Sequence, residues 1–154
     1  MIDDEYFLAA LRLAAGNDPI PSHVSAAARD VYGLRVPHAR TADHVECAAM
    51  GMSSAGSGTR DDDGSHVMRF VTTGLTFDVE VSVDDGLIDV AGQVAPYPGE
   101  GTLVDVKTPH LTLTTRITHN GQFAATGLPP GWVSVVCHRP GHKPVQTGWV
   151  RVRP

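Results

Sequence analysis

Apolar residues recur at helical spacing in the first third of the chain. The first run predicts a helix over residues 3–15, whose apolar face carries Phe7, Ala10, Leu11, Ala14 and Ala15. Gly16 follows it and predicts a left-handed C-terminal cap. A second run predicts a helix capped by Ser22 and ended at Gly33, with a face of Val24, Ala27, Ala28, Val31 and Tyr32. A weaker third run predicts a helix over residues 41–50.

From Val67 onward the apolar period changes from helical to two. Residues 75–83, "LTFDVEVSV", alternate between a buried and a wet face, and the turn Asp84-Asp85-Gly86 leads into a second strand, "LIDVAGQVA". Further strands are predicted at 102–107, 111–117, 122–126, 132–138 and 145–152. The pattern predicts a mainly β fold, an antiparallel sandwich of seven or eight strands preceded by two or three short helices.

A polar segment separates the two patterns. Residues 53–65, "SSAGSGTRDDDGS", hold too little apolar surface to offset the entropy lost on ordering. Three parts are therefore predicted: an N-terminal helical segment over 1–52, a flexible linker over 53–65 and a β-sandwich domain over 66–154. The three consecutive aspartates lack the alternate spacing and the distal glutamate of a calcium loop, so a solvated turn is expected there.

The formal charge of −5 is unevenly distributed. Residues 1–65 hold ten acids against five arginines, and after Asp105 no acid follows. The later segment instead carries a basic strip of Lys107, Arg116, Arg139, Lys143, Arg151 and Arg153, interleaved with His110, His119, His138 and His142. Such a strip could bind a nucleic acid or an acidic protein surface. Alternatively, the acidic N-terminal segment of the same chain covers it, and both interpretations stay open.

The N-terminus and the cysteines indicate a location inside the cell. The chain begins with the acidic residues Asp3, Asp4 and Glu5, whereas a secretory signal begins with basic residues followed by an apolar run, and no membrane span is visible. Cys47 and Cys137 lie ninety residues apart, each without a nearby partner. We therefore expect a cytoplasmic protein with two buried, reduced thiols.

Residues 121–137, "GQFAATGLPPGWVSVVC", resemble the carboxypeptidase regulatory-like, or prealbumin-like (transthyretin-like), β-sandwich. A turn glycine, Gly121, precedes the aromatic Phe123, and the turn Leu128–Gly131 leads into a strand with alternating valines. The acidic start, the two helices and "LTFDVEVSVDDG" are similar to small proteins of high-GC bacteria encoded beside extracytoplasmic-function sigma factors. The resemblance covers most of the chain except 34–66, and it implies a protein that regulates or escorts a sigma factor or another neighbouring gene product.

Catalytic patterns are incomplete. The prealbumin-like fold also hosts a hydrolase of a purine breakdown product, which uses histidines, an arginine and a C-terminal Tyr-Arg-Gly-Ser tail, whereas this chain ends in "WVRVRP". A hydrolase would need His110, His138, His142 and Arg116 to gather at one end of the sandwich. Ser53 and Ser54 lack the strand-to-helix turn of a serine elbow. No catalytic residue is predicted, and the protein is not expected to be an enzyme.

Two groups of side chains resemble metal ligands only in part. His44, Glu46 and Cys47 form one group, and Cys137, His138 and His142 form the other. Neither supplies the four ligands of a structural zinc site, so no metal and no cofactor are predicted. Trp132 and Trp149 lie near strand ends, where they could stack on a sugar or a base, so a carbohydrate- or small-ligand-binding sandwich is the alternative function.

The sequence therefore predicts a non-catalytic interaction or regulatory module. Its alanine-rich helices are about three turns long and would not be stable alone in water, so their apolar faces need a covering surface. We expect a protein partner, by resemblance a sigma factor, and neither nucleic acid nor membrane. The predicted partner-binding residues are Phe7, Leu11, Val24, Val31 and Tyr32. If the helices pack on the sandwich instead, the basic strip becomes the candidate surface.

Overall fold

The computed structural model describes residues 4–17, 20–45 and 65–153. The chain forms two compact units, Met1–Arg35 and Val36–Pro154, which are described separately. The predicted linker, apart from Ser65, lies outside the described residues, as does Cys47. No helix among the described residues is long and apolar enough to cross a membrane.

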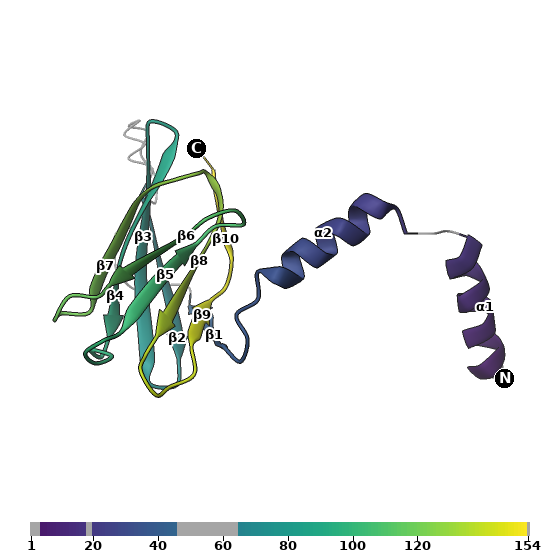
Figure 1. The fold of residues 1–154 in the computed structure, drawn as a ribbon, viewed down its shortest axis with the longest axis horizontal. Helices are drawn as coiled ribbons and strands as arrows, with labels where there is room; N and C mark the ends of the chain where they lie inside the picture. Colours follow the sequence, from purple (N-terminus) through teal and green to yellow (C-terminus); the bar gives the residue numbers. More distant parts are fainter. Residues whose placement is uncertain (1–3, 18–19, 46–64, 154) are drawn as a thin grey trace, which may run out of the picture. The chain divides into compact units, whose positions relative to one another are not determined.

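The first unit contains two helices, α1 (Asp4–Asn17) and α2 (Ser22–Gly33), labelled in Figure 1. Both predicted helices are confirmed, and Asp4 and Glu5 occupy the first turn of α1, where the helix dipole favours acids. Two predicted caps are wrong. The N-cap of α2 is Pro21, with no side-chain cap hydrogen bond, and α1 continues through Gly16, whose φ is not positive.

The predicted third helix is wrong. Residues 40–45 form a strand, β1 (Arg40–Val45), and residues 46–50 lie outside the described part. β1 pairs antiparallel with β2 (His66–Thr72) and parallel with β9 (Val145–Thr147). Hydrogen bonding to two distant strands overrides the weak helical spacing, because strand formation depends more on context than on local propensity.

The predicted hairpin after Val67 is confirmed. β3 (Leu75–Asp84) pairs antiparallel with β4 (Leu87–Ala95) from Thr76↔Ala95 to Asp84↔Leu87. The two turn residues between them, Asp85 and Gly86, have φ values of 47° and 77°. Positive φ at both central positions is typical of the type I′ turn, whose twist matches that of the flanking strands.

The remaining strands follow the predicted order. They are β5 (Leu103–Lys107), β6 (Thr112–Arg116), β7 (Gln122–Leu128), β8 (Gly131–His138) and, after β9, β10 (Val150–Val152). The strand predicted at 145–152 is divided at Gly148 and Trp149 into β9 and β10. With β1 added, the described residues form ten strands in place of the expected seven or eight.

The strands hydrogen-bond in the order β6-β5-β8-β9-β1-β2-β3-β4-β7, and β10 pairs with β8. β6 and β7, the two ends of this order, lie close to each other, so the sheet is nearly closed into a barrel (Figure 1). The mainly β prediction is confirmed. The sheet is not wholly antiparallel, because β1 and β9 run parallel.

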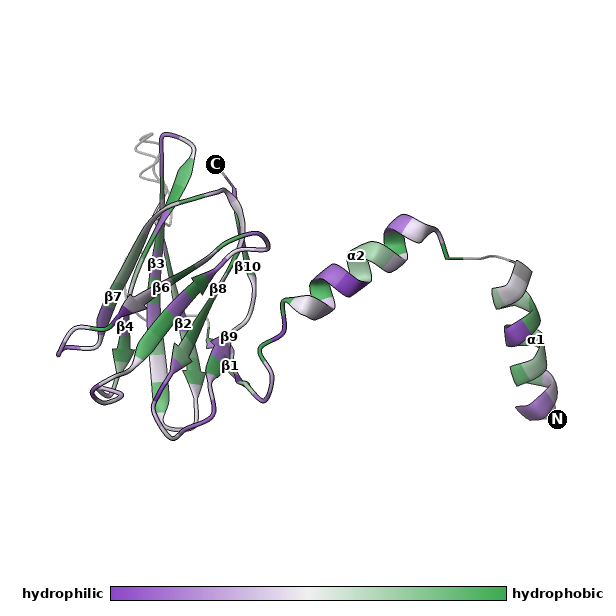
Figure 2. Ribbon diagram, viewed as in Figure 1, coloured by the Kyte–Doolittle hydropathy of each residue, from purple (hydrophilic) through white to green (hydrophobic). Residues whose placement is uncertain are grey.

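The core lies inside this nearly closed sheet. Every core residue that the structure describes belongs to the second unit, and the fully buried ones include Phe70, Phe77, Ile88, Leu128, Val104 and Val135. On β3, Phe77, Val79 and Val81 are buried. Figure 2 shows the apolar residues of the strands in green. The β unit thus fills its interior with its own side chains.

Gly92 and Phe123 form a tight cross-strand pair between β4 and β7. A Cβ added at Gly92 would lie 2.5 Å from Cζ of Phe123 and 2.6 Å from the backbone oxygen of Asp78. The Phe123 ring is buried and covers the glycine, as aromatic residues often do for glycines in sheets. Any side chain at position 92 therefore displaces either the ring or the backbone of β3.

Gly92→Ala is expected to lower the free energy of unfolding by about 1–3 kcal/mol, the usual cost of overpacking a core. Chemical denaturation monitored by circular dichroism measures this change. Gly148→Ala is the matched control, since a Cβ there would have no atom within 4 Å and the φ is not positive. Equal stability of the two variants would contradict the proposed contact.

Candidate functional site

The predicted partner-binding residues are exposed on the two helices. Phe7 and Leu11 lie on α1, and Val24, Val31 and Tyr32 lie on α2, with exposed fractions between 46% and 69%. The ring of Tyr32 has the Arg35 guanidinium 5.1 Å from its centroid, a cation–π contact that leaves the other ring face free. No residue of α2 is buried.

Exposed apolar surface is concentrated on this short segment. Of the fifteen large apolar side chains that are exposed among the described residues, nine lie between Tyr6 and Tyr32. The nine are Tyr6, Phe7, Leu8, Leu11, Leu13, Ile20, Val24, Val31 and Tyr32. Each helix shows green, apolar stretches along its length in Figure 2. Such a density of apolar side chains is typical of a segment that binds another surface.

A second surface is a groove that contains both tryptophans. Its volume is about 1070 Å³, and its walls come from β1, β2, β8 and the segment through β10. Trp132 is exposed and Trp149 is half-buried. The other polar or aromatic lining residues are His44, Ser65, His66, Phe70 and Arg151. Aromatic faces beside imidazoles and a guanidinium suit a planar or sugar-like ligand.

The β8–β10 pairing places both tryptophans on the same groove. Trp132 pairs with Arg151 in the register of the two strands, and Trp149 directly precedes β10. Across the groove, the His44 ring packs against the Phe70 ring, with centroids 5.3 Å apart and a tilt of 58°. His44 therefore has an aromatic contact that fixes one wall of the groove.

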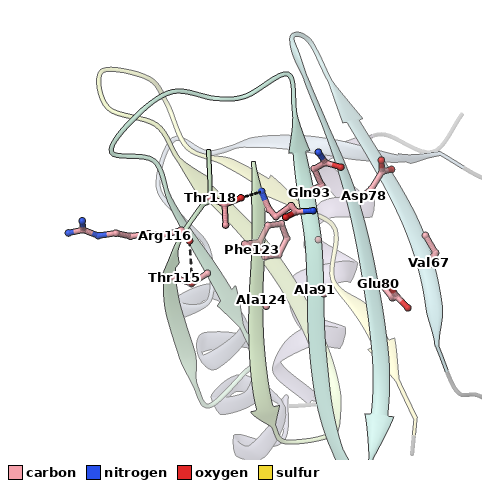
Figure 3. A pocket seen from close by; sticks show the side chains of 12 residues that line it. Val67, Asp78, Glu80, Ala91, Gln93, Thr115, Arg116, Thr118, Phe123 and Ala124 are labelled. Carbon is pink, nitrogen blue, oxygen red and sulfur yellow. Dashed lines mark hydrogen bonds between the residues drawn. The ribbon is translucent and has the colours of Figure 1, made fainter. Parts of the chain in front are cut away.

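A third surface is a shallow groove of about 640 Å³ lined by residues of β2, β3, β4, β6 and β7 (Figure 3). Asp78 and Glu80 line it on one strand, and Ala91 and Gln93 on the next, while the Arg116 side chain points away from them. Its polar groups already have partners. Asp78 accepts two hydrogen bonds from Arg69, at 2.6 and 2.9 Å, Glu80 accepts one from Ser65, and Gln93 donates to the Asn120 carbonyl. Three of its polar side chains, Asp78, Glu80 and Gln93, are thus already engaged in hydrogen bonds.

The histidines of the hydrolase alternative are only partly brought together. Leu103 pairs with Arg116 on one side and with His138 on the other, and the turn after β8 carries His142 at the same end. His110 follows the opposite end of β5, beyond the Lys107↔Ser134 pair. The length of β5 therefore separates His110 from the other three.

Asp105 is the centre of a small polar cluster that the sequence did not indicate. Its Oδ1 accepts a hydrogen bond of 2.6 Å from the Thr114 hydroxyl, and its Oδ2 lies 2.8 Å from Nε2 of His138. A nucleophilic triad needs the imidazole between the hydroxyl and the carboxylate. Here the carboxylate lies between the hydroxyl and the imidazole, so the histidine is not placed to activate Thr114.

The candidate metal groups do not assemble among the described residues. No three or more His, Cys, Asp or Glu side chains meet there in a way that could hold an ion. Cys137 lies in the core, and His138, next along β8, is half-buried and reaches Asp105. Glu46 and Cys47 lie outside the described residues, so the group with His44 is not tested.

Comparisons with protein-family models, curated proteins and solved structures give no match. The resemblance to the prealbumin-like family thus depends on residues 121–137 and the pattern upstream. Two structural features are compatible with that motif. Gly121 and Gly131 have φ values of 78° and 132°, as expected for glycines that reverse the chain at each end of β7.

Cys137 is expected to resist alkylation in the folded protein. Burial raises the pKa of its thiol to about 11, although the charge of Arg139 acts in the opposite direction. At about pH 8 the thiolate should thus be roughly 100-fold scarcer than for an ordinary cysteine, so iodoacetamide should react at least that much more slowly than with unfolded chain. Mass spectrometry of a Cys47→Ser variant measures labelling at Cys137 alone.

The same raised pKa gives a sign for the pH dependence of stability. The folded state holds the thiol proton of Cys137 more tightly than the unfolded state does. The contribution of this group to the free energy of unfolding is therefore intact below the ordinary thiol pKa of 9.0 and is lost as pH rises toward about 11.

The alkylation test has a clear contradicting outcome. Rapid labelling of folded Cys47→Ser protein at about pH 8 would contradict the buried position of the thiol.

Proposed function

We propose that this chain is a non-catalytic interaction module that presents two short apolar helices to a protein partner. The observation that carries the proposal is the concentration of exposed large apolar side chains between Tyr6 and Tyr32. The contact with the partner is formed by the side chains of Phe7, Leu11, Val24, Val31 and Tyr32. The β unit is the stably folded part of the chain.

The completeness of the β core supports this division of roles. Among the described residues, the core lies within Val36–Pro154, and neither α1 nor α2 contributes to it. Burying a Leu, Phe or Val side chain contributes about 1.5–3 kcal/mol, so covering even a few of the exposed ones would supply useful binding energy. Short alanine-rich helices are marginally stable alone, and binding would then stabilise their helical state.

The charge of the helical segment and the family resemblance both indicate which kind of protein is the partner. Residues 1–35 carry the acids Asp3, Asp4, Glu5, Asp18 and Asp30 and the bases Arg12, Arg29 and Arg35. An apolar surface with a basic rim complements such a segment. By resemblance, a sigma factor of the extracytoplasmic-function type is the first partner to test, and the β unit would be a prealbumin-like sandwich with a regulatory role. Since the chain would act by binding, no catalytic residue is needed.

A second candidate function is small-ligand binding in the tryptophan groove. Both tryptophans of the chain line that one groove, together with His66 and Arg151. A carbohydrate or nucleoside would stack on the exposed Trp132 and hydrogen-bond to the neighbouring polar groups. This function is compatible with partner binding, because it uses a different part of the chain.

Photo-crosslinking tests the helix contact. Benzoylphenylalanine replaces Phe7 or Tyr32 in the full-length chain, co-expressed with a sigma factor of the extracytoplasmic-function type from the same genome. Both positions should give a crosslinked product containing the sigma factor, identified by mass spectrometry. Replacement of Tyr97, a similarly exposed aromatic residue of the β unit, is the matched control and should give none.

Affinity gives a second readout of the same contact. Leu11→Asp and Val31→Asp should each weaken binding by about tenfold or more, because each buries a charge in an apolar interface. Leu87→Asp, at an exposed position in the β unit, should have little effect. Crosslinks from Phe7 and Tyr32 that join the chain to its own β unit, or to a second copy of itself, would contradict a heterologous partner.

Intrinsic fluorescence tests the groove. The chain has two tryptophans, both in the groove, so selectively excited tryptophan emission reports on that site. A bound oligosaccharide or nucleoside should change the emission saturably, and Trp132→Phe should remove most of the change. Unchanged emission across both ligand classes would argue against ligand binding there, while leaving the helix contact to its own test.

A further inference from the structure

Four basic side chains surround a small pocket in the β unit. Arg40, Arg139, His142 and Lys143 line it together with Gly141, and its volume is about 250 Å³. Pockets for drug-sized ligands usually measure about 300–1,000 Å³. This pocket therefore suits a small ion, or the terminal charged group of a larger molecule.

The backbone fixes the two segments that supply these side chains. Arg40 begins β1 and pairs with Val145 of β9, and its N–H donates a hydrogen bond of 2.8 Å to the Pro144 carbonyl. The turn after β8 is closed by the His142 N–H, which donates to the Arg139 carbonyl at 3.1 Å. Gly141 in that turn has a φ of 73°. The cluster is thus built by strand pairing and turn geometry, not by the reach of flexible side chains.

The positive charges of the pocket have no counter-charge among the described residues. No acidic side chain lines the pocket, and none forms an ion pair with Arg40, Arg139 or Lys143. Asp105, which pairs with the neighbouring His138, also accepts a hydrogen bond from Thr114. Cations held close together repel each other, so an anion between them lowers their energy.

The side chain of Arg139 provides more specific evidence for a bound acceptor. Its Nε is buried and has no hydrogen-bond partner. A buried donor without an acceptor is costly, and native proteins rarely leave one unsatisfied. The Cys137 thiol cannot supply a negative charge, because burial raises its pKa to about 11 and keeps it neutral at physiological pH.

We propose that Arg40, Arg139, His142 and Lys143 form a binding site for a phosphate-sized dianion. The planar guanidinium groups of the two arginines match the geometry of phosphate oxygens, and the ammonium of Lys143 adds a point charge. Inorganic phosphate and the phosphate group of a small phosphomonoester share this chemistry. None of these four residues belongs to the helices or lines the tryptophan groove, so the site does not depend on either proposed function.

Isothermal titration of the full-length chain tests the site. Inorganic phosphate and glycerol 3-phosphate are titrated separately at neutral pH and constant ionic strength, with chloride as the reference anion. Phosphate should bind saturably at one site, and Arg139→Gln should weaken binding about tenfold or more, the usual loss for a charged hydrogen bond. Tighter binding of glycerol 3-phosphate would identify the monoester as the source, and equal or tighter binding of phosphate would identify the free ion.

Two further variants make the result specific. Lys143→Gln, at an exposed position, should also weaken binding, and it replaces Arg139→Gln if that variant fails to fold. Arg116→Gln, an exposed arginine outside the pocket, should bind as the unchanged protein does. The proposal is overturned if phosphate binds no better than chloride, or if Arg116→Gln loses as much affinity as the pocket variants. Tighter binding of single-stranded DNA than of phosphate, equally weakened by Arg116→Gln, would also overturn it, in favour of an extended nucleic-acid surface.

Discussion

The alternation of apolar and polar side chains along β3 is the constraint on which the rest of the β unit depends. Phe77, Val79 and Val81 fill the interior, and Asp78 and Glu80 between them face outward. A shift of the pairing by one residue would exchange these two sets, which fixes the register against both β2 and β4. β4 in turn positions β7, where Phe123 covers Gly92.

This self-contained core has a consequence for the helices. Since the β strands supply every core residue in the part of the chain that the structure describes, α1 and α2 are not needed to complete the interior of the β unit. Their apolar side chains are exposed, and helices of this length gain most of their stability from packing. A segment with these properties is well suited to binding, because it can become ordered on a partner surface and gain stability from the contact.

The β unit also positions the tryptophan groove and the basic pocket, so one rigid scaffold presents several separate surfaces.

The sequence predicts local features well and long-range pairings poorly. Alternation in β3, positive-φ turn residues such as Gly86, and the helical spacing of Phe7 and Leu11 are all visible in short stretches of sequence.

β1 was missed because "RTADHV" has no regular apolar alternation and pairs in parallel with β9, about one hundred residues later. Arg40 therefore joins Arg139 and Lys143 through a pairing that local pattern does not show. The sequence places Trp132 and Trp149 near strand ends, but their position in one groove depends on the β8–β10 register.

Native-state hydrogen exchange of the isolated chain tests the central claim most directly, because it measures the stability of each element separately. If the β unit is complete without the helices, the amides of α1 and α2 should exchange about 100-fold or more faster than those of β3 and β4, whose opening requires loss of the core. Helix amides protected as strongly as those of β3 would contradict the account, since their apolar faces would then be buried within the protein and unavailable to a partner.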